Sequence, residues 1–363
     1  MPAAGKFMFG FRLFSRFVSN MEFRRDKMFG FHYYAPTRVV FGKGAEGKAG
    51  ELAASAHCKK VLLHYGSGSV IDSAKAIGYG VANEGDVWDF YEHTRKAEGC
   101  LPIGVVLTIA AAGSEMSGSS VITKEDGKAK RSYKSDFCRP VFAIMDPELT
   151  MTLPAYQTAC GCTDILMHTM ERYFTNGGNM ELTDAIAEGL MRTVMEQAII
   201  LRDDPQNYNA RAEVMWASSL SHNGLTGCGT DGGDFATHGL EHEMGGMFDV
   251  AHGAGLAAIW GSWARYVLES CTPRFARFAR KVMGIADGGT EREAALQGIA
   301  AMEEFFRSIE MPTNMKELGI APSEEELRTM AHMCSAAAGG KKGSAKVLEE
   351  RDMLEIYRMA LGE

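Results

Sequence analysis

The sequence lacks several features that would place it in large classes of proteins. Its eight cysteines form no C-x-x-C pair and no regular framework of spacings, which argues against a thiolate zinc site and favours a reducing, cytoplasmic location. No window of about 18 consecutive apolar residues occurs, so we expect no helix that spans a membrane and no membrane partner.

Positive charge is scarce outside the N-terminal segment. The formal net charge is -8, and the first 31 residues hold six Lys or Arg against Glu22 and Asp26, so the remainder carries -12. A body this acidic repels polyanions, and nucleic acid is therefore not an expected partner.

Residues 1–30 form a leader of unknown role, in which Phe is interleaved with Lys and Arg. The first 31 residues contain eight of the 19 Phe in the chain. Three interpretations stay open: a targeting segment or membrane-surface helix, a contact between subunits, and a start-site artefact or disordered leader that precedes structure from about Met28. The charged start, apolar run and small-residue cleavage site of a signal peptide are missing.

The length of 363 residues favours two domains, since one hydrophobic core stops growing at roughly 250 to 300 residues. The first, residues 31–150, has short β-branched and apolar runs that alternate with helical spacing, which predicts a Rossmann-like α/β nucleotide-binding domain with a parallel sheet. The expected strands are 33–41, 60–64, 101–107 and 141–145, the expected helices are 45–55 and 70–82, and 124–134 is an expected hairpin or loop.

From residue 151 to residue 363 the spacing of apolar residues is helical throughout, which predicts an all-helical second domain. The expected helices are roughly 155–175, 183–201, 209–224, 234–246, 254–269, 290–308, 324–337 and 350–361. The cleft between the two domains is the default place for a site.

A cluster of histidines in the helical part carries the chemistry. Asp164 precedes His168 by four residues, and His238 precedes His242 by four, so each pair lies on one face of a helix. His252 follows within fifteen residues of His238, on a short glycine-flanked loop that returns towards the first helix.

We predict that Asp164, His168, His238 and His252 bind one metal ion. One carboxylate oxygen and three imidazoles suit Fe²⁺ or Zn²⁺ and leave a coordination position open for a substrate oxygen. His242 is then the candidate catalytic residue, as a proton relay or a substrate contact. A single His-x-x-x-His pair is more often an ordinary surface or core feature, but two such pairs with an Asp and a fifth group favour the metal site.

Two loops are candidates for binding a nucleotide phosphate. Gly66 and Gly68 lie between an expected strand and an expected helix that begins after Ser69, where backbone N–H groups point at an anion. This is not a G-x-G-x-x-G sequence, and a tight connecting turn is an equally ordinary interpretation. The stretch TIAAAGS at 108–114 follows a buried strand, at the edge of the sheet where ligands of open α/β sheets gather.

These residues and their neighbours resemble the iron-containing (group III) alcohol dehydrogenase family, in its NADPH-preferring, butanol-dehydrogenase-like branch. The resemblance runs from about Gly30 to the C-terminus, and two stretches are highly specific: TDILMHTMERYFT at 163–175 and THGLEHEMGGMFDVAHGAGLA at 237–257. Further matching stretches are FHYYAPTRVVFGKG, GSVIDSAKAI, DVWDFY, LPIGVVLT, GSEMSGSSVIT and DPELTMTLP.

The resemblance implies hydride transfer between a nicotinamide cofactor and small aldehydes or primary alcohols such as butanol. It implies a metal held by the four predicted ligands, with His242 beside the substrate. With the two loops it gives these candidate cofactor-binding residues: Gly66, Gly68, Ser69, Asp72, Thr108, Gly113 and Ser114. A homodimer is the base-rate expectation for the assembly.

The chain departs from the family pattern in its first domain. The family has two Gly-rich turns there, and this chain has one, as if a helix and a strand between His64 and Val70 had been skipped. A βαβ unit needs about 30 or more residues, which do not fit in this interval. The family commonly has Thr where this chain has Ala112. We therefore predict weak or absent cofactor affinity, because a lost strand removes part of the adenosine pocket.

Cofactor choice and function have ranked alternatives. Small residues after the first strand, with no Asp to receive a 2′-hydroxyl, favour NADP(H) over NAD(H). The leading function is a metal-dependent alcohol dehydrogenase or aldehyde reductase, and the alternative is a catalytically impaired, metal-binding remnant. A metal-assisted elimination, as in glycerol-dehydrogenase-like or dehydroquinate-synthase-like relatives, is disfavoured because those relatives lack the context of His238 and His242 and the GSEMSG stretch.

Overall fold

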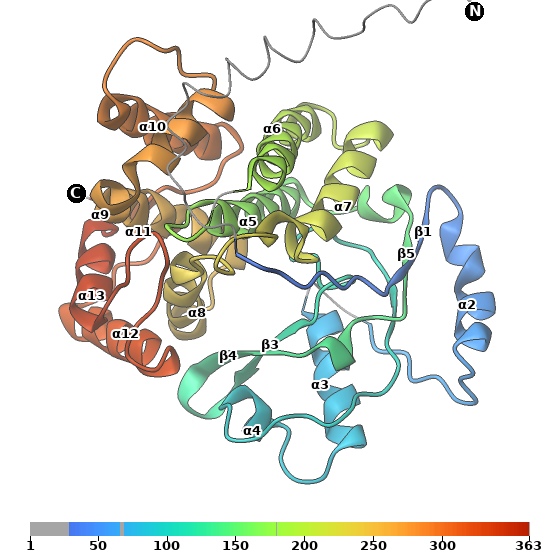
Figure 1. Ribbon diagram of the computed structural model, residues 1–363. Helices are drawn as coiled ribbons and strands as arrows, with labels where there is room; N and C mark the ends of the chain where they lie inside the picture. The colour runs from blue at the N-terminus through green and yellow to red at the C-terminus, as the bar shows by residue number, and fades with distance from the viewer. Residues whose placement is uncertain (1–28, 66–68, 179, 363) are drawn as a thin grey trace, which may run out of the picture.

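The computed structural model describes residues 29–65, 69–178 and 180–362. It combines an α/β part, formed by the described residues up to 150, with a helical part formed by the described residues that follow (Figure 1). The predicted fold class is confirmed. Residues 1–28 of the N-terminal leader and the predicted cofactor residues Gly66 and Gly68 lie outside the described residues.

Three parallel strands form the main sheet of the α/β part. They are β1 (Arg38–Phe41), β5 (Phe142–Met145) and β2 (Gly104–Val106), in the order β1-β5-β2. Ala143 of β5 is paired with Val39 on one side and Val105 on the other. Because β5 alone has a partner on both sides, the outer edges of β1 and β2 have no neighbouring strand among the described residues.

The prediction of a strand at 60–64 is wrong. Residues 60–65 form no helix or strand, and Val61, Leu62 and Leu63 are 69, 75 and 79% exposed. The run is apolar enough for a buried strand, but a strand forms only where a neighbour offers paired backbone groups and an apolar layer covers its side chains. The other expected strands are present in shortened form.

The remaining elements of the α/β part surround the sheet. The expected hairpin is present as β3 (Ser119–Lys124) and β4 (Ala129–Lys134), an antiparallel pair apart from the main sheet. The helix expected at 70–82 is α3 (Val70–Ala82). The short elements are η1 (Ala45–Lys48), α2 (Ala49–Ser55), α4 (Trp88–Tyr91), η2 (Asp126–Lys128), η3 (Asp136–Cys138) and η4 (Pro147–Thr150).

The helical part follows the predicted order of helices. The elements are α5 (Ala155–Tyr173), α6 (Glu181–Asp203), α7 (Tyr208–His222), η5 (Leu225–Gly227), α8 (Ala236–Phe248), α9 (His252–Lys281), α10 (Glu291–Ser308), α11 (Met315–Leu318), α12 (Glu324–Ala337) and α13 (Glu350–Met359). Helix α9 runs twelve residues beyond its expected end at 269, with non-helical backbone at Cys271 and with Pro273 inside it. A proline within a helix removes one backbone hydrogen bond, which explains why the sequence predicted an earlier end.

One apolar core joins the two parts. The largest cluster of buried side chains contains Val105 of β2 and Ala143 of β5 together with residues of the long helices, among them Trp260 and Trp263 of α9. The sheet is therefore packed directly against the helical part, which fixes the position of the loops that follow its strands.

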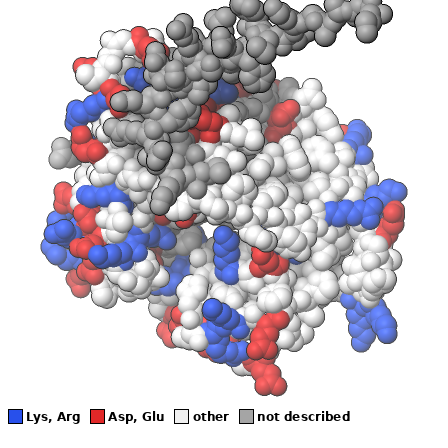
Figure 2. Space-filling view, in the orientation of Figure 1, with Lys and Arg blue, Asp and Glu red and all other residues white. Residues whose placement is uncertain are grey.

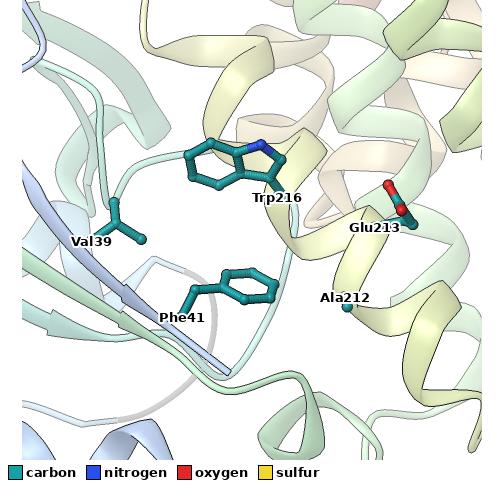
Figure 3. A pocket seen from close by; sticks show the side chains of 5 residues that line it. All are labelled: Val39, Phe41, Ala212, Glu213 and Trp216. Atoms are coloured by element: carbon teal, nitrogen blue, oxygen red, sulfur yellow. The ribbon is translucent and has the colours of Figure 1, made fainter. Parts of the chain in front are cut away.

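The surface shown in Figure 2 has Lys and Arg interspersed with Asp and Glu on the left of the view and a broad area without charged side chains in the centre. No helix of the described residues is both long enough and apolar enough to cross a bilayer. A hollow of about 370 Å³ lies between β1 and α7 and is lined by Val39, Phe41, Ala212, Glu213 and Trp216 (Figure 3). This hollow contains none of the predicted site residues.

Candidate metal centre

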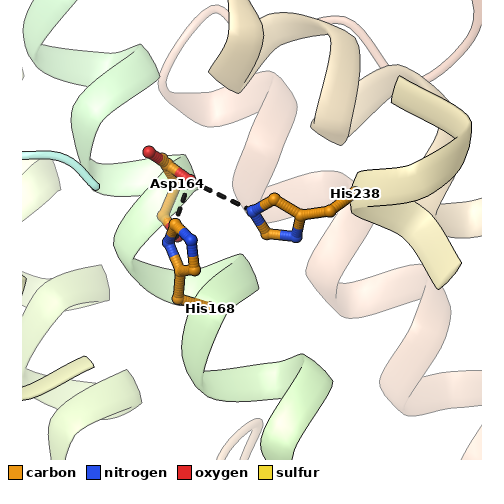
Figure 4. Close-up of side chains that lie close together, drawn as sticks. All are labelled: Asp164, His168 and His238. Atoms are coloured by element: carbon orange, nitrogen blue, oxygen red, sulfur yellow. Dashed lines mark hydrogen bonds and ion pairs between the residues drawn. The ribbon is translucent and has the colours of Figure 1, made fainter. Parts of the chain in front are cut away.

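Three helices bring the four predicted ligands together. Asp164 and His168 lie one turn apart on α5, His238 lies on α8, and His252 is the first residue of α9. Figure 4 shows the Asp164 carboxylate between the rings of His168 and His238. Asp164, His168 and His238 are at most 7% exposed. The site is therefore formed inside the helical part.

Close packing of α9 against α5 places His252. A Cβ atom on Gly253 would lie 2.2 Å from the backbone oxygen of Cys160, so only glycine permits this approach. The loop between α8 and α9 spans only residues 249–251. Both features return the chain towards α5, as the glycine-flanked loop predicted.

The distances suit one small cation. The Oδ1 atom of Asp164 lies 3.0 Å from a ring nitrogen of His168, 3.5 Å from Nε2 of His238 and 3.7 Å from Nε2 of His252. Ligand atoms about 2.1 Å from a tetrahedral ion stand roughly 3.4 Å apart. Ligand atoms of Asp164, His168 and His238 all lie within 4.8 Å of one another, whereas His252 approaches this group through Asp164 alone. Three of the four predicted ligands therefore already lie close enough together to share an ion.

Two buried ligand atoms have no hydrogen-bond partner among the described residues. They are Oδ1 of Asp164 and Nε2 of His238. An unpaired polar atom in a buried position costs about 1–3 kcal/mol, so such atoms are retained where something else satisfies them. Together with the one-oxygen, three-nitrogen donor set, they fit a divalent ion of the Fe²⁺ or Zn²⁺ type.

Two buried glutamates orient the histidines. Glu171 on α5 accepts a hydrogen bond from Nδ1 of His238 and, at 3.0 Å, from its backbone N–H; Glu241 on α8 pairs with Nδ1 of His252. Each carboxylate fixes the tautomer that leaves Nε2 free to bind a metal. Neither glutamate was predicted from the sequence, although each lies three residues after a predicted ligand and so on the same helix face.

Lys130 connects the α/β part to this centre. From β4 its ammonium group reaches Glu241 at 3.2 Å and lies 3.5 Å from Nδ1 of His252. Glu241, His242 and His252 form a second group whose donor atoms lie near one another, but the ammonium group of Lys130 already pairs with Glu241 there. The structure therefore favours one metal position, at Asp164.

The charges of the cluster shift the ligand pKa values in opposite directions. Burial alone would raise the pKa of Asp164, but His168 and His252 hold it well below its usual range. Burial lowers the pKa of His168 to about 4 despite the nearby Asp164. Burial opposes the charge on His238 too, yet Glu171 raises its pKa to about 9. Asp164 and His168 thus already have the charge states that bind a metal, whereas His238 must release a proton when it binds one.

His242 lies beside the four predicted ligands and not among them. Its ring centroid is 6.3 Å from that of His238 and 5.8 Å from that of His252, and the side chain is partly buried. Burial, with Lys130 and His252 nearby, lowers the pKa of His242 well below its usual range. This position suits a contact with a molecule that enters beside the metal.

A fifth imidazole was not predicted. His222, the last residue of α7, has its ring centroid 4.0 Å from that of His168. The buried guanidinium of Arg172 reaches both residues: it donates to the backbone oxygen of His168 at 2.8 Å and to Nδ1 of His222 at 3.3 Å. No local pattern indicates His222, because it lies 54 residues after His168 and shares no helix with a predicted ligand.

The predicted cofactor residues lie on separate elements. Ser69 is exposed at the start of α3, and Thr108 is exposed just beyond β2. Gly113 is buried with φ +62°, and a Cβ there would lie 2.4 Å from the backbone oxygen of Ser218 on α7. The loop after β2 therefore runs directly against the helical part.

Asp72 and Ser114 are held by neighbouring protein groups. Asp72 accepts hydrogen bonds from Oγ of Ser114 at 2.5 Å and from the backbone N–H of Val121 at 3.0 Å. Lys75 is fully buried and donates to Oγ of Ser114 and to the backbone oxygens of Ser114, Ser117 and Ser119. These contacts join α3 to the loop after β2 and to β3, so they stabilise the packing of the α/β part.

The described residues fit only part of a dinucleotide. The N-terminus of α3 and exposed Thr108 are suited to phosphate and ribose groups. An adenosine pocket of the Rossmann kind needs further strands beside β2, and the described residues provide none.

The comparison with known proteins decides the family. A sequence model described as the Fe-containing alcohol dehydrogenase family, C-terminal, matches residues 158–361, and one described as iron-containing alcohol dehydrogenase matches residues 64–147. The chain belongs to the iron-containing alcohol dehydrogenase family. The resemblance seen in the sequence is thus confirmed, and the predicted ligands and His242 lie within the first of these matches.

Curated members of the iron-containing alcohol dehydrogenase family align over most of the chain. NADH-dependent butanol dehydrogenase A of Clostridium acetobutylicum is 36% identical over 299 residues, which is 82% of this chain and 76% of the relative. NADPH-dependent aldehyde reductase YqhD of Escherichia coli is 30% identical over 352 residues, which is 81% of this chain and 90% of the relative. The crystal structure of NADH-dependent butanol dehydrogenase A from Thermotoga maritima is 32% identical, with a TM-score of 0.88, and the match spans 93% of this chain and all of that one.

The alignment with the Escherichia coli reductase is longer than the part of this chain that it covers. It extends over 352 positions, but 81% of the 363 residues of this chain is only about 294, so about 58 positions have no residue of this chain. The N-terminal family match begins at residue 64, inside the interval where a helix and a strand were inferred to be absent. Both findings agree with a shortened first domain.

Proposed function

We propose that the protein is a metal-dependent oxidoreductase that interconverts small aldehydes and primary alcohols, butanol among them, with NADP(H) as hydride donor or acceptor. The observation that carries the proposal is the buried cluster of Asp164 with His168, His238 and His252, in which two ligand atoms have no other partner. Membership of a family of alcohol dehydrogenases supports the reaction type.

Each residue of the centre has a defined role in this proposal. When bound, a divalent ion supplies Lewis-acid polarisation of a carbonyl oxygen, and the nicotinamide supplies hydride. Asp164 and the three histidines hold the ion, while Glu171 and Glu241 keep the imidazoles of His238 and His252 in the binding tautomer. His242 contacts the substrate or moves a proton to its oxygen.

The identity of the metal ion and the choice between NADP(H) and NAD(H) are also part of the proposal. We favour Fe²⁺, with Zn²⁺ as the alternative, because the two ions accept the same ligands and availability often decides between them. We favour NADP(H), with NAD(H) as the alternative. The relatives support both, since the butanol dehydrogenases are named NADH-dependent and the Escherichia coli reductase is named NADPH-dependent.

We also propose a cytoplasmic homodimer that acts on small molecules and binds neither nucleic acid nor membranes. The acidic body and the unpaired cysteines support this assignment.

A direct assay tests the proposal. Purified protein is loaded anaerobically with Fe²⁺ or Zn²⁺, its metal content is measured, and oxidation of NADPH or NADH by butyraldehyde is followed at 340 nm. We expect about one ion per chain and metal-dependent oxidation of NADPH. Binding of less than a tenth of an ion per chain under these conditions contradicts the proposal.

A second candidate, a metal-binding protein with impaired catalysis, is favoured by the short sheet and by the exposed run at 61–65. It predicts a full complement of metal, weak or absent binding of NADPH in a calorimetric titration, and no turnover. Submicromolar affinity for NADPH excludes this candidate.

A further inference from the structure

His222 lies where the metal centre meets the α/β part. Its ring packs edge-on against that of His168, with 4.0 Å between centroids and an angle of 68°. On its other side the loop after β2 approaches so closely that a Cβ on Gly113 would lie 2.9 Å from Cβ of His222. A molecule that reaches both the metal ligands and this loop therefore passes beside His222.

Arg172 fixes the tautomer of His222. Its guanidinium is anchored by hydrogen bonds to the backbone oxygens of His168 at 2.8 Å and Ser221 at 3.0 Å, and it approaches Nδ1 of His222 at 3.3 Å. A guanidinium can only donate, so Nδ1 of His222 must accept. The ring proton is therefore on Nε2, which is a hydrogen-bond donor.

This donor is unused. Among the described residues Nε2 of His222 has no hydrogen-bond partner, and the residue is partly accessible although its ring packs against that of His168. Arg172 is 7% exposed and leaves the ring little freedom to turn. A donor that is fixed in direction, unpaired and accessible is suited to recognise an oxygen of a bound molecule.

We propose that His222 determines specificity by donating a hydrogen bond from Nε2 to a second substrate oxygen, on the carbon next to the reacting one. The inference rests on the proposed function and adds a substrate class to it: small aldehydes and alcohols with an oxygen at the neighbouring carbon, in preference to unbranched alkyl compounds. A site that hydrogen-bonds a hydroxyl discriminates against an analogue without it, because the donor is then left unpaired.

A packing role for His222 makes a different prediction. Leucine has a similar volume and would fill the space against His168, but it donates no hydrogen bond. Glutamine keeps an N–H donor at about the position of Nε2. The pair His222→Leu and His222→Gln therefore separates hydrogen bonding from packing, and His332→Leu, at an exposed histidine on α12, is the matched control.

The test uses two alcohols of equal size. The full-length protein is loaded with Co²⁺, and its visible absorption band is titrated with 1,2-ethanediol and with 1-propanol, which differ by a hydroxyl in place of a methyl group. We expect the wild type and His332→Leu to bind the diol about 5- to 10-fold more tightly, the effect of one additional hydrogen bond. His222→Leu loses this preference, and His222→Gln keeps part of it.

Two results overturn the proposal. If the wild type shows no preference, the donor is not used; if His222→Leu keeps the preference, the diol is chelated by the metal. Absence of a Co²⁺ band means instead that the proposed metal function is wrong. In that case ¹⁵N spectra of the histidines in the metal-free protein still test the role of His222. The signals of His222 are assigned as those that are missing from the spectrum of His222→Gln. A proton on Nδ1, or no response of Nε2 to the diol, overturns the proposal.

Discussion

The helical part and the α/β part of this protein differ in how completely they form their sites. In the helical part the four predicted ligands come from three helices, and buried carboxylates orient two of them. In the α/β part the described residues include α3 and the loop after β2, but they provide only three strands for the main sheet, and an apolar run remains exposed. A metal site needs only a few side chains at fixed helical spacing. A dinucleotide site needs all the strands of the sheet that carries it, so a missing segment impairs a dinucleotide site more than a metal site.

The largest expected effect is the loss of the metal from the helical part. Asp164→Asn keeps the size of the side chain but removes the charge that all three histidines approach. We expect metal affinity to fall by more than about 100-fold, since loss of outer partners alone costs about 10- to 100-fold. Competition with a chromophoric chelator measures this, with His332→Ala as the exposed control. If Asp164→Asn binds the metal as tightly as the wild type, the helical part does not contain the metal site described here.

The second prediction concerns repair of the α/β part. We expect that insertion between His64 and Val70 of the corresponding segment of a butanol dehydrogenase increases NADPH or NADH affinity by about 10- to 100-fold, the equivalent of one or two recovered hydrogen-bonded contacts. Calorimetry measures the affinity, and a Gly/Ser linker of the same length is the control. Equal affinity for the repaired, control and original chains would show that the shortened sheet does not limit binding.

The third prediction concerns a residue that orients a metal ligand and does not itself bind the metal. Glu171→Gln preserves shape but weakens the hydrogen bond to Nδ1 of His238, so we expect metal affinity to fall by about 10- to 100-fold, less than for Asp164→Asn. Glu188→Gln, a buried glutamate that contacts Tyr173 and Arg277, is the matched control and should retain the metal. An equal loss in both variants would indicate general destabilisation.

The smallest effect is expected at the boundary between the two parts. Glu115 is 1% exposed and accepts a hydrogen bond from Ser219 on α7, and burial raises its pKa. A raised carboxyl pKa means that the folded protein binds the proton more tightly than the unfolded chain. The contribution of protonated Glu115 to the free energy of unfolding is therefore fully present below the pKa that Glu115 has in the unfolded chain. It is lost as the pH rises through the pKa of Glu115 in the folded protein.

Glu115→Gln removes that titration. At pH 8 we expect the variant to be more stable than the wild type by about 1–2 kcal/mol, the scale for a poorly satisfied buried group, with no difference at pH 4. Urea unfolding at both pH values measures the free energies. If the wild type instead becomes more stable than Glu115→Gln as the pH rises, the ionised carboxylate of Glu115 is stabilised by its surroundings and the prediction is wrong.

The sequence predicted those features that depend on local spacing. Asp164 and His168 share a helix face, and His252 follows a short loop, so their meeting could be inferred without coordinates. His222 and Lys130 reach the centre only through the packing of α7 and of the β3–β4 hairpin, which no local pattern encodes. The strand expected at 60–64 is absent because its apolar residues fit a buried strand, but the pairing that would bury them is a property of the whole sheet.

Lys75 offers a reason why the shortened part keeps its shape. Its buried amine donates to oxygens of Ser114, Ser117 and Ser119 and so ties α3 to the loop after β2 and to the start of β3. Such a tie is made of four short contacts and does not depend on how many strands lie further out. The inner framework of the α/β part can therefore form without a wider sheet around it.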